Sequence, residues 1–244
     1  MKTGTHSVQR MLKSYRSRHE PESRMLLTSV LAQRKGLLSE KQVNRILRLR
    51  NINLHLEIES SHHLGPFVPS LVQLFPESKF VFTTRECISW MDSLLNFTLE
   101  KDLSKKELQA AFGRGVRFDI GLSYSPHDGP LESLGFRPLR SYFRYWTEHN
   151  RTIISSVPAE RLLTIKMRNL PKSADHLARF LGIDVSTISV TDSHRFKTKT
   201  KHHFLNSLDR QYVLDVAQEE CELVHSSLFP GISIENDLNA ILDS

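Results

Sequence analysis

The chain has 244 residues, of which 39% are hydrophobic and 25% are charged, which is enough to bury a substantial core. Its formal net charge of +6 and its pI near 9.4 favour anionic ligands, whether a phosphorylated nucleotide, a nucleic acid or an acidic membrane surface. No run reaches the roughly 18 apolar residues that a membrane-spanning helix needs, and the first residues are too polar for a secretory signal peptide. Because no basic run alternates with aromatic residues, we expect no nucleic-acid partner.

The cysteine pattern bears on metal sites and on location. Cys87 and Cys221 lie far apart in the sequence and match neither a zinc-ligand spacing nor a disulfide framework. We therefore expect no metal site, reduced thiols and a cytoplasmic protein. The Asn-x-Thr triplets at Asn96 and Asn150 are then chance matches to a glycosylation pattern.

Hydrophobic periodicity predicts helices and strands that alternate along the chain. In chain order we expect helices over 8–15, 22–34 and from the N-cap Ser39, a strand over 52–59, a helix over 67–75, a strand over 79–84, helices over 87–99 and 139–156, a strand over 162–166, and helices over 175–181 and 209–228. This alternation predicts an α/β fold, with a mostly parallel central sheet flanked by helices in three layers. We expect one domain over residues 1–244, with a loop-rich insertion at 101–140.

The chain opens with Lys-Thr-Gly-Thr-His-Ser directly before the first predicted helix. A phosphate group needs backbone N–H donors that it can approach closely, a fixed cation and a helix N-terminus. Gly4 permits the approach, Lys2 supplies the cation, and Thr5, His6 and Ser7 offer further donors. The alternative is an ordinary polar terminus.

A second candidate phosphate site follows the strand predicted over 79–84. Arg85 stands at its C-terminal end, where open α/β sheets bind ligands, and Ser93 follows eight positions later on the next helix. The planar guanidinium of arginine suits a phosphate. The alternative is that Arg85 pairs with a nearby acid, Glu86 or Asp92.

With these two motifs the sequence resembles the sulfotransferase family that uses 3′-phosphoadenosine 5′-phosphosulfate. The phosphosulfate loop of that family reads Pro-Lys-Ser/Thr-Gly-Thr and runs into a helix, and its 3′-phosphate site uses an arginine at a strand end with a serine eight residues on. The resemblance extends in order over further stretches at 71–94, 146–150, 157–163 and 180–183. It implies a P-loop-like sulfotransferase fold.

The resemblance also implies roles for single residues. Lys2 would stabilise the negative charge that develops as the nucleotide leaves, and the loop from Thr3 to Ser7 would hold the 5′-phosphate. Arg85 and Ser93 would bind the 3′-phosphate.

Family members close the 3′-phosphate site with a late basic loop. Here the basic run around Arg195 and Lys197 is the candidate, although it does not match the family motif, and a solvated basic loop is the alternative.

Sulfuryl transfer to a hydroxyl needs a base that takes the acceptor proton. In the family this is a histidine or glutamate just beyond the second strand. Strand alternation would put Glu57 and Glu59 on one face, with Glu59 nearer the site, so we rank Glu59 first, then His62, His63 and Glu57. Most of these four are expected to be ordinary polar residues at a strand end.

In the family a buried strand precedes the phosphosulfate loop, and this chain has Met1 in the position of the proline that ends that strand. Three explanations are possible. The natural start lies upstream, another segment fills the place of the strand, or the chain is a degenerate family member. We favour the first. The basic turn at 166–168 also departs from the acidic or aromatic turn that is common in the family.

The predicted function is transfer of a sulfuryl group from 3′-phosphoadenosine 5′-phosphosulfate to a hydroxyl of a glycan, a lipid or a small metabolite, with no metal. The insertion at 101–140 is expected near the acceptor. A non-catalytic nucleotide-binding protein of the same fold is the alternative. A P-loop kinase is disfavoured, because the chain has neither its glycine-rich motif nor an aspartate at the end of the strand over 79–84. The sequence does not indicate an oligomeric state.

Overall fold

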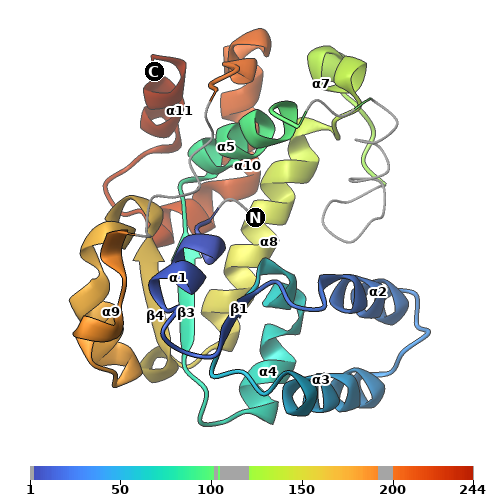
Figure 1. Ribbon diagram of the computed structural model, residues 1–244. Coiled ribbons are helices and arrows are strands. Elements are labelled where there is room, and N and C mark those ends of the chain that lie inside the picture. Colours follow the sequence, from blue (N-terminus) through green and yellow to red (C-terminus); the bar gives the residue numbers. More distant parts are fainter. Residues whose placement is uncertain (1–2, 102–103, 105–120, 192–199, 244) are drawn as a thin grey trace. The chain divides into compact units, whose positions relative to one another are not determined.

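A computed structural model describes residues 3–101, 104, 121–191 and 200–243 (Figure 1). The chain divides into two compact units. Of the described residues, the first holds 3–84 and 152–191, and the second holds 85–101, 104, 121–151 and 200–243. The single domain expected from the sequence remains a prediction, and the units are described in turn.

The first unit combines short parallel strands with helices. Its elements are α1 (Thr5–Met11), β1 (Ser17–His19), α2 (Ser23–Arg34), α3 (Glu40–Leu54), β2 (Ile58–Ser60), η1 (His62–Phe67), α4 (Val68–Leu74), β3 (Phe80–Thr84), η3 (Ala159–Arg161), β4 (Leu162–Lys166), η4 (Met167–Lys172), α9 (Ala174–Leu181) and η5 (Val185–Thr187). Strand β1 pairs with β2 and β3 pairs with β4, both in parallel. The α/β class is therefore confirmed, but in the part of the chain that the structure describes the strands form two separate pairs instead of one central sheet.

The strand predicted over 52–59 is wrong in its first part. A capping box at Ser39, whose side chain accepts from the Gln42 amide while the Gln42 side chain accepts from the Ser39 amide, starts α3, and this helix continues through Leu54. The chain leaves the helix at His55, which has a left-handed φ of 45°. Only Ile58–Ser60 remain as a strand. The apolar residues that suggested alternation include Ile52, which is exposed on the helix surface.

The core of the first unit joins α1 to β4 and α9. Met11, Leu170 and Leu177 are completely buried in one cluster with residues of these elements. The Ser189 amide donates to the Met11 carbonyl at 2.8 Å and ties the segment after α9 to the end of α1. Helix α9 is closed by Gly182, which is in a left-handed conformation, so the helix expected over 175–181 ends where the sequence predicted.

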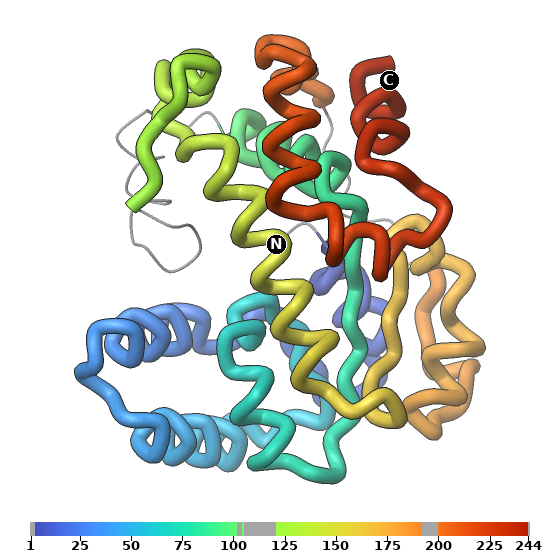
Figure 2. Tube along the Cα trace, turned by 180° about the vertical axis from the view of Figure 1, so that it is seen from behind, coloured from blue at the N-terminus to red at the C-terminus, as the bar shows by residue number. Residues whose placement is uncertain are grey.

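The second unit is helical. Its elements are α5 (Cys87–Leu99), η2 (Pro126–Asp128), α7 (Gly129–Leu134), α8 (Leu139–Ser156), of which the part after Arg151 belongs to the first unit, η7 (Phe204–Ser207), α10 (Arg210–Leu228) and α11 (Ile234–Leu242). Helices α10 and α11 pack on α5, and Figure 2 shows their course from behind. The described part of the predicted insertion holds the short helices η2 and α7. No described helix combines the length and apolar character that crossing a bilayer requires.

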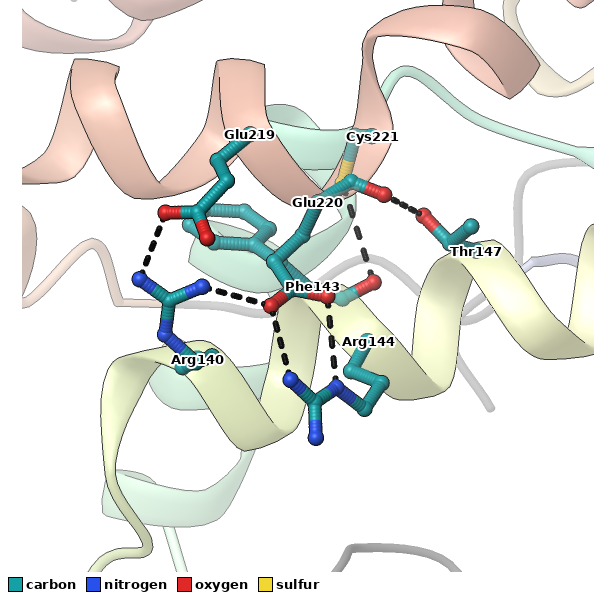
Figure 3. Close-up of polar contacts among 7 residues, drawn as sticks. All are labelled: Arg140, Phe143, Arg144, Thr147, Glu219, Glu220 and Cys221. Atoms are coloured by element: carbon teal, nitrogen blue, oxygen red, sulfur yellow. Dashed lines mark hydrogen bonds and ion pairs between the residues drawn. The ribbon is translucent and has the colours of Figure 1, made fainter. Parts of the chain in front are cut away.

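Polar contacts join α8 to α10 (Figure 3). Glu220 accepts from Arg140 at 2.7 Å and from Arg144 at 3.0 Å, and its backbone carbonyl accepts from the Thr147 hydroxyl at 2.7 Å. The adjacent Glu219 accepts from Arg140 at the exposed edge of the contact. These bonds fix the register of α8 and α10. The Glu220 carboxylate that accepts them is mostly buried.

Candidate functional site

The loop predicted to bind phosphate turns into α1 at a position that favours glycine. Gly4 is the N-cap of α1 and adopts a left-handed φ of 85°. A Cβ at this position would lie 2.1 Å from the Met167 sulfur, so both the conformation and the space favour glycine. The first amides of a helix have no partner within the helix and can bind an anion. Lys2 lies outside the described residues.

The loop is attached to the C-terminal ends of β1 and β2. The Ser60 hydroxyl donates to the Thr5 carbonyl at 2.6 Å, and the Thr5 hydroxyl lies 3.1 Å from His19 Nε2. The His6 ring stacks on the His19 ring with centroids 4.5 Å apart. His19 and Ser60 are paired in the strand register. The start of α1 therefore lies at the edge where parallel α/β sheets place their ligands.

A carboxylate–histidine cluster lies at the same edge. Glu20 follows β1, and its carboxylate makes a hydrogen bond with Nδ1 of His62, the first residue of η1. The Nε2 atom of His63 lies 3.6 Å from the other Glu20 oxygen, and both histidine side chains are buried. Burial raises the pKa of Glu20, but hydrogen bonds from His62 and His63 outweigh it and hold that pKa far below its usual range. The Glu20 carboxylate is therefore ionised at neutral pH.

Glu20 was not identified from the sequence. Strand β1 is only three residues long and reads Ser-Arg-His, without an apolar alternation that would predict it. Glu20 itself has a left-handed φ of 50°, which is uncommon for a residue with a side chain and often marks a functional site. Its place beside His62 follows from the pairing of β1 with β2, which no local pattern shows.

The structure places Glu59 and Glu57 in other surroundings. Arg50, which is buried on α3, donates to both oxygens of Glu59 at 2.5 and 2.6 Å. Glu57 precedes β2 and accepts from the Arg16 amide at 2.9 Å with its side chain largely exposed. Of the four residues considered as the base, His62 and His63 are the two that the fold brings together with Glu20.

Arg85 directly follows β3 in the chain, as the sequence predicted, and begins the second unit. Its carbonyl accepts from the Trp146 ring at 3.0 Å, which anchors the backbone at this point. Burial lowers the pKa of Arg85, while the charge of Asp92 raises it. Within the described ranges Arg85 forms no ion pair, so the alternative pairing with Glu86 or Asp92 is not observed.

Ser93 is buried on α5. Farther along this helix the Asn96 side chain accepts from the His202 amide at 2.7 Å, and Glu100 accepts from the Thr200 amide at 3.2 Å. These hydrogen bonds hold residues 200–202, which follow the basic run, against α5, the helix that carries Ser93. Arg195 and Lys197 lie outside the described residues.

Among the residues that the structure describes, the fold brings together two groups of possible metal ligands that the sequence did not predict. One is Glu20 with His62 and His63, and the other is Cys87 with His225 and Asp237. In each group the ligand atoms lie within 4.8 Å of one another. Their members are separated by up to 150 positions (237 minus 87), so spacing in the sequence could not identify them.

A comparison with known families finds a match to the sulfotransferase domain over residues 1–196. No curated protein matches this sequence significantly. The matched range includes the Gly4 loop, the Glu20–His62 contact, Arg85 and Ser93, and it ends before α10. Because the match covers most of the 244 residues, the chain belongs to the sulfotransferase-domain family.

Proposed function

We propose that this chain transfers the sulfuryl group of 3′-phosphoadenosine 5′-phosphosulfate to a hydroxyl group. The chain belongs to the sulfotransferase-domain family. The observation that supports the proposed reaction is the position of the Gly4 loop. Through Thr5 the loop is bonded to the ends of β1 and β2, from which Glu20 and His62 follow. An anion-binding helix start and a carboxylate-bound histidine therefore lie at one strand edge.

The donor nucleotide is bound by its phosphates. Backbone amides from Gly4 to Ser7 hold the 5′-phosphate, and Lys2 stabilises the negative charge on the oxygen of the departing nucleotide. Arg85 and Ser93 bind the 3′-phosphate. Arg85 is half-buried and forms no ion pair with any described residue. Its guanidinium is therefore available for an anion.

His62 acts as the base in place of Glu59. Because the ionised Glu20 accepts at Nδ1, the proton of a neutral His62 ring is on Nδ1 and the basic lone pair is on Nε2. Nε2 takes the acceptor proton as the acceptor oxygen bonds to sulfur. The bond from sulfur to the nucleotide oxygen breaks, and its electron pair leaves with the nucleotide. Glu59 is less suited, since Arg50 occupies both of its oxygens.

Nucleotide binding is the first test of this proposal. Calorimetry with 3′-phosphoadenosine 5′-phosphate should show micromolar binding that Arg85→Ala abolishes and that His62→Gln leaves in place. Glu57→Gln is a matched control, because this exposed carboxylate lies outside the strand and is not assigned to the nucleotide. If the nucleotide does not bind the wild-type chain, the proposed function is wrong.

Transfer is the second test, and it uses donor labelled with ³⁵S and a panel of phenol, sugar and sterol hydroxyls. His62→Gln should reduce the rate by about 10²–10⁴-fold, the usual contribution of a general base. Hydrolysis of the donor in water gives a readout that does not depend on the acceptor. Binding without transfer or hydrolysis would instead support the non-catalytic nucleotide-binding alternative.

A further inference from the structure

The second unit contains a buried cluster of metal-ligating side chains that the proposed reaction does not use. Cys87 is the first residue of α5, His225 lies on α10 and Asp237 lies on α11. Cys87 and His225 are completely buried, and Asp237 is 4% exposed. A thiol, an imidazole and a carboxylate from three helices thus meet in the interior of one unit, with their ligand atoms within 4.8 Å of one another.

We propose that Cys87, His225 and Asp237 bind a structural zinc ion. Sulfur, imidazole nitrogen and carboxylate oxygen are the three donor types that Zn²⁺ uses in proteins, in a tetrahedral arrangement. Zinc–ligand bonds of about 2.0–2.3 Å place tetrahedral ligand atoms about 3.3–3.8 Å apart. Since the ligand atoms lie within 4.8 Å of one another, zinc binding would draw them together by roughly 1.5 Å at most.

His225 gives independent support for a ligand at this place. Neither of its ring nitrogens has a hydrogen-bond partner in the described part of the chain, although both are buried. Its ring lies among aromatic neighbours, with the Phe229 centroid at 5.2 Å and the Trp146 centroid at 6.1 Å. A buried imidazole without partners is costly, and a bond to a metal ion would satisfy one nitrogen.

Cys221 is a second buried thiol in this unit, although its sulfur is not among the ligand atoms that lie within 4.8 Å of one another. Cys221 and His225 are four positions apart on α10 and therefore share one face of the helix. In the structure the Cys221 thiol donates to the Phe143 carbonyl at 3.6 Å (Figure 3). Turning Cys221 toward the ion as a fourth ligand would break that weak bond. Each cysteine that binds zinc releases its thiol proton to the solvent.

The surroundings of Asp237 hold its carboxylate in a fixed orientation. Its carboxylate accepts from the Ile88 and Ser89 amides at 2.9 and 3.1 Å, and from the Ser89 hydroxyl at 2.5 Å. These groups are the N-terminus of α5, whose dipole favours negative charge. Oδ2 accepts both amides, whereas Oδ1 accepts only the hydroxyl and keeps a lone pair for a metal. The helix start thus orients the ligand in the manner of an outer coordination shell.

The test uses the full chain and zinc itself. After incubation with excess Zn²⁺ and gel filtration, elemental analysis should find about one ion per chain. Loading with Co²⁺ should produce a thiolate-to-cobalt charge-transfer band and the intense visible bands of a tetrahedral site. Cys87→Ser should lose the charge-transfer band, and Asp237→Asn should lower the metal content.

Glu20→Gln is the matched control, because Glu20 belongs to the other possible ligand group, which contains no sulfur. This variant should keep both the zinc and the cobalt band. The proposal is wrong if wild-type protein retains only traces of zinc, or if Co²⁺ gives no thiolate band. It is also wrong if Glu20→Gln removes the metal while Cys87→Ser keeps it. Should the Cys87 variant fail to fold, the wild-type cobalt spectrum decides alone, and every one of these outcomes is independent of sulfuryl transfer.

Discussion

The Arg50 guanidinium donates to both carboxylate oxygens of Glu59, so that the consecutive elements α3 and β2 share a nearly buried ion pair. Arg50 also donates to the Pro21 carbonyl at 2.8 Å, just after β1. One arginine side chain therefore connects α3 with the segments around both strands of the first pair. This assigns Glu59 to the stability of the strand edge where His62 lies.

Glu59→Gln should reduce the free energy of unfolding by about 3 kcal/mol, because it leaves the Arg50 charge buried with one partner removed. Urea denaturation measures this change. Glu57→Gln is the control and should change stability by less than about 1 kcal/mol, since its contact with Arg16 is exposed. A Glu59→Gln protein of unchanged stability that has lost all transfer would identify Glu59 as the base after all.

Gly4→Ala should reduce stability by about 1–2 kcal/mol for the left-handed backbone alone, and by more because its Cβ meets Met167. Gly36→Ala is a matched control, as Gly36 has a φ of 70° and nothing within 4 Å of an added Cβ. Urea denaturation and nucleotide calorimetry on both variants separate the effect of the left-handed backbone from the effect of the steric contact with Met167. Shortening Met167 to alanine in the Gly4→Ala background should recover part of the difference, and no recovery would contradict the steric contribution.

The Glu20 carboxylate should make stability depend on pH in the acid range. Its folded pKa lies below the ordinary value of 4.5, so its contribution is complete above about pH 4.5 and is lost as the pH falls below that value. Urea midpoints of wild-type protein should therefore decline between about pH 5 and pH 3, and Glu20→Gln should flatten that decline. Identical slopes for the two proteins would show that Glu20 is not held in its ionised form.

Glu220→Gln should destabilise the second unit by about 1–2 kcal/mol, because it weakens charged hydrogen bonds from Arg140 and Arg144 to a carboxylate that is 12% exposed. The adjacent Glu219, 63% exposed, is the control, and its replacement by glutamine should cost less than about 0.5 kcal/mol. Thermal or urea unfolding gives both values. Equal effects of the two substitutions would refute the distinction between a buried and an exposed contact.

Local signals in the sequence predicted the helices well. The capping residue Ser39 and the glycine after α9, Gly182, mark a helix start and a helix end, and the structure places both there. The paired strands β3 and β4 were predicted because each is a continuous β-prone run. These features depend on neighbours within a few residues, which a single sequence displays.

Features that depend on distant contacts were missed. The three-residue strand β1 exists through its pairing with β2, and α3 continues into residues whose alternation suggested a strand. Of the candidate site, the Gly4 loop was predicted from its motif, and His62 was predicted, after Glu59, from the family resemblance. Glu20 could not be found in that way, because only the parallel register brings it to His62 across 42 positions.

The carboxylate of Asp237 receives the first amides of α5, the helix that begins two residues after Arg85. Asp237 lies well beyond residue 196, where the match to the sulfotransferase domain ends. A shortened chain that stopped at that boundary would leave the start of α5 without its cap and Cys87 without His225 beside it. The matched family domain is therefore shorter than the segment that folds as a unit. Expression trials should keep α10 and α11.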